Sequence, residues 1–384
     1  MINNSSLRFL SRLLAFFCIL AFFQVVFYIN FDYYFVSNGS YLNIPDHIFY
    51  EGVVTGFGLA PDISSLNNYV VSFIYSIFYI LGMSDLVLVS LVLNIIILSY
   101  AYSRTELLCF HVTQRFLPLL YWMGLLSVLQ FSILINKDSF GVLFYVLLVS
   151  YLMLRRKTDL LLLLILCPVR LQFFLVLSFS IFLVGGINSR KGRLKVIAKV
   201  AFLYCLCSVI ALYLESNESL LAHSYYSEGG VAYWISTLNS QYYIGSFLLN
   251  VLKPIQYVYD LFRSAIIDDS LLGWGVYFSR LYLVFVILIL SVRFCSAVYL
   301  PWRFFERREK FFVSIVVCSF FLVYSISPIV DYRYLINIAP VLMLFFVMRK
   351  PQSIHGQVKV SEGQIQPSSR VDGAMAIAPE TLRS

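Results

Sequence analysis

Apolar runs recur along the whole chain and are separated by short polar stretches. Many approach the roughly 17–25 residues that a helix needs to cross the hydrocarbon core of a bilayer. The strands of a membrane barrel would be about ten residues long with alternating polarity, and no such pattern is present. The sequence therefore predicts an all-α integral membrane protein with about ten membrane segments. They lie at residues 9–29, 86–102, 116–135, 140–154, 159–168, 171–186, 197–214, 277–298, 311–327 and 335–348.

Two of these segments are short and follow each other directly. Residues 159–168 and 171–186 are separated by Pro168-Val169-Arg170. One continuous helix would place an arginine near the bilayer centre, which costs about 2.5–3.5 kcal/mol on insertion scales. A short helix out, a break at Pro168 and a second helix back would place Arg170 near a membrane face. Broken helices at membrane depth are tolerated where they line a cavity.

Three stretches are predicted to lie outside the bilayer core. Residues 30–85 form a first external segment, in which the Tyr-rich and Ser-rich run 67–81 is an interfacial helix closed by Gly82. Residues 215–275 form a large, polar and aromatic external loop, and the basic run 189–195 is an internal loop. The last part, 349–384, is predicted to be a disordered cytoplasmic tail. Residues 1–348 then form one transmembrane catalytic domain.

Charge distribution sets the predicted orientation. Charged residues are only 12% of the chain and hydrophobic residues 60%, whereas soluble domains carry about 25% charged residues. All but six of the 28 Lys and Arg residues fall on one side of the predicted topology, so both termini are expected in the cytoplasm. The net charge of +8 is explained by the Lys and Arg residues in the predicted cytoplasmic loops and does not indicate nucleic-acid binding. The seven cysteines lie in or beside apolar runs and predict neither a disulfide framework nor a metal site.

The opposite side collects charges from separate loops at the ends of predicted spans. These are Asp46, Glu51, Lys137, Asp138, Arg170, Asp331 and Arg333. Cations hold a phosphate or pyrophosphate, and arginine does so in a bidentate manner. A carboxylate can take the proton from an attacking hydroxyl. Such a set beside apolar helices predicts an enzyme that acts on a lipid-linked phosphosugar.

Each residue also has a structural interpretation. Asp46 alone could be a solvated loop carboxylate, and Lys137 with Asp138 a helix cap and its neighbour. Arg333 could pair with Asp331 or reach lipid headgroups. His47 is more simply an ordinary loop histidine, and the four histidines have no metal-ligand spacing. Arg170 is the hardest to explain structurally, because it follows a proline between two short apolar runs.

The order of these features resembles a known family. Pro45-Asp46-His47-Ile48-Phe49-Tyr50 follows the first span, then come Asn68-Tyr69, Gly82 and Leu93-Asn94, then Lys137-Asp138, Pro168-Val169-Arg170-Leu171-Gln172 and Tyr332-Arg333-Tyr334 with Pro340. Over about residues 8–348 this pattern resembles the multi-spanning glycosyltransferases of the GT-C superfamily, the group of protein mannosyltransferases and aminoarabinose transferases. The chain departs from these relatives because it has no large soluble C-terminal domain, no second acid beside Asp46, and Val-Arg-Leu where Arg-Pro is common.

The resemblance implies an inverting transfer of a sugar from an undecaprenyl-phosphate or other polyprenyl-phosphate donor. The acceptor would be a glycan or lipid on the external face of a bacterial inner membrane. It implies Asp46 as the general base and Lys137, Arg170 and Arg333 as the ligands of the donor phosphate. Asp138, Glu51 and His47 are further candidates for substrate binding. No cofactor is implied beyond the lipid-linked donor, and a role for a divalent cation stays open.

Two other functions fit the same pattern. A polysaccharide polymerase of the Wzy type would act on O-antigen or exopolysaccharide repeat units linked to undecaprenyl diphosphate. Small size, many spans and one large external loop favour it. A transporter or flippase of lipid-linked glycans would instead require charges at the midplane and an inverted repeat, which the sequence does not clearly contain.

Overall fold

The computed structural model describes residues 4–29, 50, 52–54, 66–113, 137–185, 190–216, 231–256, 259, 281, 284–285, 288, 308–327 and 333–347. Helices are the only regular secondary structure in this part, which confirms the all-α prediction there. They belong to one compact unit, Met1–Arg349. Within the described residues, three helices are long and apolar enough to cross a membrane, over Leu86–Thr113, Lys195–Leu214 and Glu309–Ile326. These helices indicate a membrane protein. The predicted span 116–135, most of 277–298 and the tail 349–384 lie outside the described residues.

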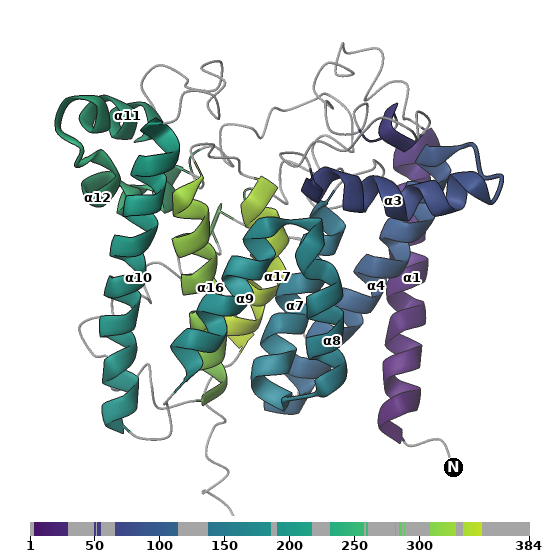
Figure 1. Cartoon of the computed structure of the whole chain (residues 1–384). Coiled ribbons are helices and arrows are strands. Elements are labelled where there is room, and N and C mark those ends of the chain that lie inside the picture. Colours follow the sequence, from purple (N-terminus) through teal and green to yellow (C-terminus); the bar gives the residue numbers. More distant parts are fainter. Residues whose placement is uncertain are drawn as a thin grey trace, which may run out of the picture. The chain divides into compact units, whose positions relative to one another are not determined.

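Helix α7 (Asp138–Leu154) is buried along most of its length. It packs against α4 (Leu86–Thr113), α8 (Lys157–Leu166), α16 (Arg308–Ile326) and α17 (Arg333–Val347) (Figure 1). Its sequence is apolar on all sides, which is typical of a helix enclosed by others. Residues from Phe144 to Val149 have no exposed surface. Because four helices pack against α7, the positions of its two ends relative to these helices are fixed.

The predicted break between two short helices is confirmed. Helix α8 ends at Leu166 and is followed by the 3-10 turn η4 (Cys167–Val169), which contains Pro168. Proline has no N–H for the helical ladder and its ring clashes with the preceding turn. Arg170 is then extended, with φ −146° and ψ 128°, and directly precedes α9 (Leu171–Val184). The chain therefore reverses at Arg170.

Helix α3 (Leu66–Ile80) confirms the helix predicted over 67–81 and ends as its sequence suggests, whereas its interfacial position stays a prediction. Gly82 has φ +90°, and the amides of Gly82 and Met83 donate to carbonyls of the last turn at 3.0 and 3.1 Å. This pattern is a Schellman motif, which favours glycine in the left-handed region. Asp85 then caps α4, because its Oδ1 accepts the Leu88 amide at 3.0 Å. Figure 1 shows α3 crosswise to α4.

Two helix boundaries predicted from the sequence were wrong. Helix α4 continues to Thr113, beyond the predicted end at residue 102, because Arg104 and Glu106 have partners inside the bundle and do not end the helix. Helix α10 (Arg190–Ser216) begins within the basic run that was predicted to be a loop. Lysine and arginine are good helix formers, so a run of them can form the first turns of a helix.

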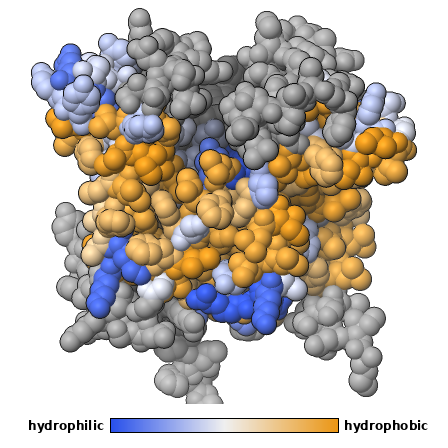
Figure 2. Space-filling view, in the orientation of Figure 1, coloured by the Kyte–Doolittle hydropathy of each residue, from blue (hydrophilic) through white to orange (hydrophobic). Residues whose placement is uncertain are grey.

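The predicted external loop 215–275 contains helices that the sequence analysis did not anticipate. They are α11 (Val231–Tyr242), α12 (Gly245–Leu249) and the turn η7 (Asn250–Leu252). Helix α1 (Asn4–Ile29), α16 and α17 coincide with predicted spans at their apolar parts. Figure 2 shows a hydrophobic band across the described helices with hydrophilic patches above and below it.

Two lysines cap helix ends from neighbouring elements. Lys253 is buried and its Nζ donates to the carbonyl oxygens of Ser325 and Ser327 at 2.5 and 2.9 Å, at the end of α16. Lys199 is only partly buried and donates to the carbonyls of Phe182 and Gly185, each at 2.7 Å, at the end of α9. Cations favour helix C-termini because the last carbonyls carry partial negative charge.

We expect Lys253→Met to lower the free energy of unfolding by about 1.5–3 kcal/mol, the range for a hydrogen bond to a charged group. The buried carbonyl of Ser325 would lose a donor that water cannot replace, and the part-buried carbonyl of Ser327 would lose one as well. The matched variant Lys199→Met should cost clearly less, because solvent reaches its carbonyls. Unfolding in mixed micelles with increasing denaturing detergent would measure both, and equal losses would contradict the assignment.

Candidate functional site

Arg170 is the centre of a buried polar cluster at one end of α7. Its side chain follows the Pro168 break, and the residue is only 7% exposed. Its Nη2 donates to Oδ1 of Asp138 at 3.0 Å. Asp138 is the first residue of α7 and is 2% exposed. A buried charge needs a partner of opposite sign. Arg170 and Asp138, which were predicted to lie on separate loops, neutralise each other here.

A third member of the cluster comes from α17. Asn337 has no exposed surface, and its Nδ2 donates to the same Asp138 oxygen at 3.1 Å. Gly141, one turn into α7, allows this approach. A Cβ at Gly141 would lie 3.0 Å from both Cγ and Nδ2 of Asn337. The glycine therefore leaves room for the amide that orients the carboxylate.

Aromatic rings cover the guanidinium. The Cζ of Arg170 lies 5.3 Å from the ring centre of Tyr334 in α17 and 6.0 Å from that of Phe173 in α9. Both distances fall in the range of cation–π attraction. The Tyr334 ring in turn packs on Tyr324 of α16, with centroids 4.7 Å apart. We name Asp138, Arg170, Tyr334 and Asn337 the Arg170 cluster.

Lys137 lies next to the cluster and contacts the predicted first external segment. It directly precedes α7, and its Nζ lies 5.9 Å from the ring centre of Tyr50. Tyr50 is buried and is the described end of the stretch that carries Asp46 and His47. Asp46, His47 and Glu51 themselves lie outside the described residues, so their placement stays a prediction.

Three helix N-termini meet at the Arg170 cluster. Asp138 opens α7, Arg170 precedes α9, and Tyr334 is the second residue of α17. The free N–H groups and the macrodipole make each N-terminus positive. Among the described residues, Lys137 and Arg170 add two cations to the Asp138 carboxylate. Such a place attracts anions, and phosphate groups bind readily at helix N-termini.

A buried hydroxyl at the same place adds a donor. Ser139, the second residue of α7, has no exposed surface, and among the described residues its Oγ has no hydrogen-bond partner. A serine hydroxyl can donate one hydrogen bond and accept two. It could therefore bind an oxygen of a ligand that enters the cluster.

Only some of these residues were predicted from the sequence. Asp138, Lys137 and Arg170 were among them, and the structure places Lys137 and Asp138 at the start of α7, where Arg170 pairs with Asp138. Arg333 is the first residue of α17, which puts its backbone at this end, and its side chain is not described. Asn337 was missed, although an amide inside the apolar run of α17 was the available signal. Polar groups in membrane segments are costly and usually face a bundle interior.

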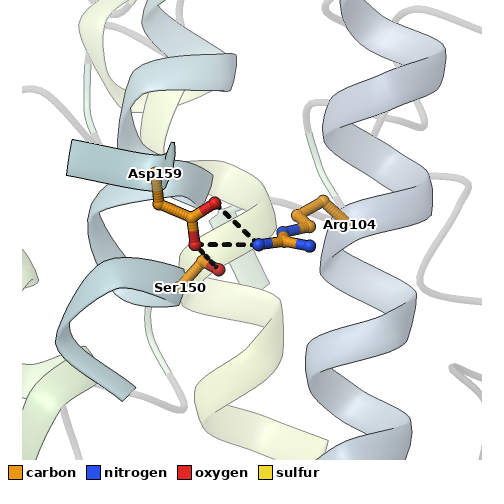
Figure 3. Close-up of polar contacts among 3 residues, drawn as sticks. All are labelled: Arg104, Ser150 and Asp159. Carbon is orange, nitrogen blue, oxygen red and sulfur yellow. Dashed lines mark hydrogen bonds and ion pairs between the residues drawn. The ribbon is translucent and has the colours of Figure 1, made fainter. Parts of the chain in front are cut away.

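A second buried charge cluster, also missed, lies toward the other end of α7. Figure 3 shows Arg104 of α4 pointing to Asp159 of α8 and Ser150 of α7. The Nη2 of Arg104 donates to both carboxylate oxygens of Asp159, at 2.7 and 2.8 Å. Ser150 Oγ donates to Oδ2 of Asp159 at 2.6 Å. All three are buried, so α4, α7 and α8 are joined by one charged network.

Glu106, close by in α4, contacts the first helix. Its Oε1 lies 3.7 Å from Nη1 of Arg12 in α1. The Arg104 and Glu106 contacts hold charges of both signs inside a candidate membrane-spanning helix. Within the described part of the chain, no group of three or more His, Cys, Asp or Glu side chains is arranged to hold a metal ion.

Comparison of the chain with models of protein families, with characterised proteins and with solved structures gave no match. The candidate site therefore rests on its own geometry. The features that carry it are the buried Arg170–Asp138 pair, the three helix N-termini and the neighbouring Lys137.

Proposed function

We propose that the protein is a membrane glycosyltransferase that moves a sugar from a polyprenyl-phosphate donor to a glycan or lipid acceptor. The observation that supports it best is the Arg170 cluster. Buried cationic and hydrogen-bonding groups meet there at three helix N-termini, within a bundle of apolar helices. A phosphate headgroup suits the first property and a long lipid tail suits the second.

Each residue has a role in this proposal. Arg170 and Lys137, with Arg333, hold the donor phosphate. A guanidinium has five N–H donors, so Arg170 can bind Asp138 and a phosphate oxygen together. Asp138 and Asn337 fix the direction of the guanidinium, and Ser139 donates to a further oxygen. The positive charge stabilises the phosphate that leaves, which is electrostatic catalysis at the place where charge develops.

The chemical step needs a base for the acceptor. Asp46 takes the proton from the acceptor hydroxyl, whose oxygen forms a bond to the anomeric carbon. The bond between that carbon and the phosphate oxygen breaks, and polyprenyl phosphate leaves with both bonding electrons. Attack opposite to the leaving group inverts the anomeric configuration. Glu51 and His47 are secondary candidates for orienting the substrate, and a divalent cation could assist the phosphate.

The membrane arrangement is part of the same proposal. The chain would cross a bacterial inner membrane in about ten segments with both termini in the cytoplasm, and the Arg170 cluster would face the external side. The excess of Lys and Arg at the opposite side of the predicted topology supports this orientation.

Glycan analysis of a deletion strain tests the function. We expect the loss of one sugar from an envelope glycan and its return when the wild-type gene is supplied. Asp46→Asn should not restore the sugar at normal protein levels, because an amide cannot accept the proton. The matched variant Asp62→Asn, in the same predicted external segment, should restore it.

The same experiment separates the alternatives. If the protein is a polymerase, its deletion would leave single repeat units in place of long chains. If it is a flippase, its deletion would leave complete lipid-linked units that are not transferred to the surface. An unchanged glycan composition in the deletion strain, or full restoration by Asp46→Asn, would contradict the proposed enzyme or its base.

A further inference from the structure

Helices α11 and α12 form a tight hairpin in the part of the chain that the sequence predicted to be an external loop. Asn239 holds its turn, because its Oδ1 accepts the Ser246 amide at 2.9 Å and its Nδ2 donates to Ser246 Oγ at 2.8 Å. Tyr243 has φ +58°, and a Cβ at Gly245 would collide with the carbonyl of Ile235. The turn is therefore closely packed.

Side chains of helix α10 satisfy two backbone carbonyls of this hairpin. Tyr204 and Ser208 of α10 donate to the carbonyls of Phe247 and Ser246 at 2.7 and 3.2 Å. Lys253, which follows η7, turns inward to the end of α16. In lipid, backbone groups must find partners within the protein, since no water is available. Water would satisfy such carbonyls in an ordinary external loop.

The outer face of the hairpin is apolar from α12 through η7 to the helical residues 253–256 that follow it. Leu248, Val251 and Ile255 are 57%, 62% and 64% exposed and follow each other at helical spacing. Tyr242 and Tyr243 are exposed at the turn between the two helices. Tyrosines at the edge of an apolar surface are typical of membrane–water interfaces. The exposed polar positions Ser240 and Gln241 lie just before this turn.

The apolar face is continuous with a candidate membrane-spanning helix. The hairpin packs on α10, whose Phe202, Val209 and Tyr213 are also exposed, and most of that helix is not covered by the rest of the chain. Figure 2 shows hydrophilic residues above hydrophobic ones in the region of α11 and α12, directly above the hydrophobic surface of α10. Helix α3, at the same end of the bundle in Figure 1, also exposes apolar residues, Phe73 and Ile80 among them.

We propose that the α11–α12 hairpin, with η7, is a membrane-interface element that rests in the headgroup region of a lipid bilayer. Leu248, Val251 and Ile255 reach the acyl chains, and Ser240 and Gln241 face water. A helix with one apolar and one polar face takes this position because it buries apolar area without crossing the bilayer. The occupant of the exposed apolar face is lipid. This inference does not depend on the proposed enzyme activity.

Fluorescent labels at single cysteines test the placement in the full chain reconstituted in lipid nanodiscs. Val251→Cys is the test position, Gln241→Cys the aqueous control and Val209→Cys on α10 the lipid control, each with the native cysteines replaced. We expect a nitroxide on the lipid acyl chain to quench the Val251 label as strongly as the Val209 label. Aqueous iodide should quench the Gln241 label several-fold more than the Val251 label.

Two outcomes would overturn the proposal. If iodide quenches the label at residue 251 as strongly as the label at residue 241, the hairpin lies in water. If neither iodide nor the nitroxide quenches the label at residue 251, a protein partner or a second copy of the chain covers the apolar face. The wild-type chain gives a check that needs no substitution. A photoreactive diazirine carried on a lipid tail should modify the peptide with residues 248–255, and its absence there would also overturn the proposal.

Discussion

Arg170→Gln is expected to abolish the proposed sugar transfer and to lower the free energy of unfolding by about 3–5 kcal/mol, the cost of removing one partner of a buried ion pair. The substitution leaves the Asp138 carboxylate in its buried place at the end of α7 without the guanidinium, whose Nη2 lies 3.0 Å away in the native protein. Thermal or detergent-induced unfolding measures the loss of stability, and glycan analysis measures the loss of transfer. Arg156→Gln, exposed just beyond the far end of α7, is the matched control and should change stability by no more than about 0.5 kcal/mol.

A double variant separates the structural role of Arg170 from its proposed role in catalysis. Arg170→Gln with Asp138→Asn replaces the ion pair by two amides that can hydrogen-bond to each other, and Asn337 can still donate to residue 138. Most of the lost stability should return, because no buried charge is left. Transfer should not return, because the phosphate has lost its cation. Recovery of transfer together with stability would show that the pair serves only the fold.

Arg104→Gln is expected to destabilise the protein by a similar amount, about 3–5 kcal/mol, for the same reason. Asp159 would keep the Ser150 hydroxyl but lose a guanidinium nitrogen that lies 2.7 and 2.8 Å from its two oxygens. The protein that remains folded should transfer sugar normally, because this network lies at the opposite end of α7 from Arg170. Activity per folded molecule therefore distinguishes the two clusters.

The double variant Arg104→Met with Asp159→Leu tests whether the charges themselves are needed. Replacing a buried ion pair by apolar residues of similar size is often neutral or stabilising. We expect unfolding close to that of the wild type, since α4, α7 and α8 would then meet through hydrocarbon. A loss as large as that of Arg104→Gln would mean that the charges have a further role, such as binding a ligand at this end.

Much of the secondary structure follows from local chemistry and could be predicted. The break at Pro168 follows from the missing N–H, and the end of α3 follows from the positive φ of Gly82. The helices between residues 215 and 275 were missed, because their polar and aromatic composition resembles that of a loop. The end of α4 was also missed, because a buried arginine cannot be told from one at a span end until its partner is known.

The candidate site was predicted in its residue types but not in its contacts. Arg170 and Asp138 were chosen as residues of two separate loops, and the structure shows that they bind each other. Asn337 could have been noticed as an amide in an apolar helix, but nothing local indicated its target. The predicted base Asp46 and its neighbours His47 and Glu51 lie outside the described residues, so only Tyr50 connects that stretch to Lys137.

By itself the sequence determined most of the apolar helices and the break at Pro168, and it placed Asp138 and Arg170 at helix ends. These properties depend on residues close to each other along the chain. Only the tertiary structure decided which ends meet. Asn337 binds Asp138 across 199 positions, and Arg104 binds Asp159 across 55. Such partners are set by the packing of whole helices around α7, and the burial that makes each charge need its partner exists only after that packing has formed.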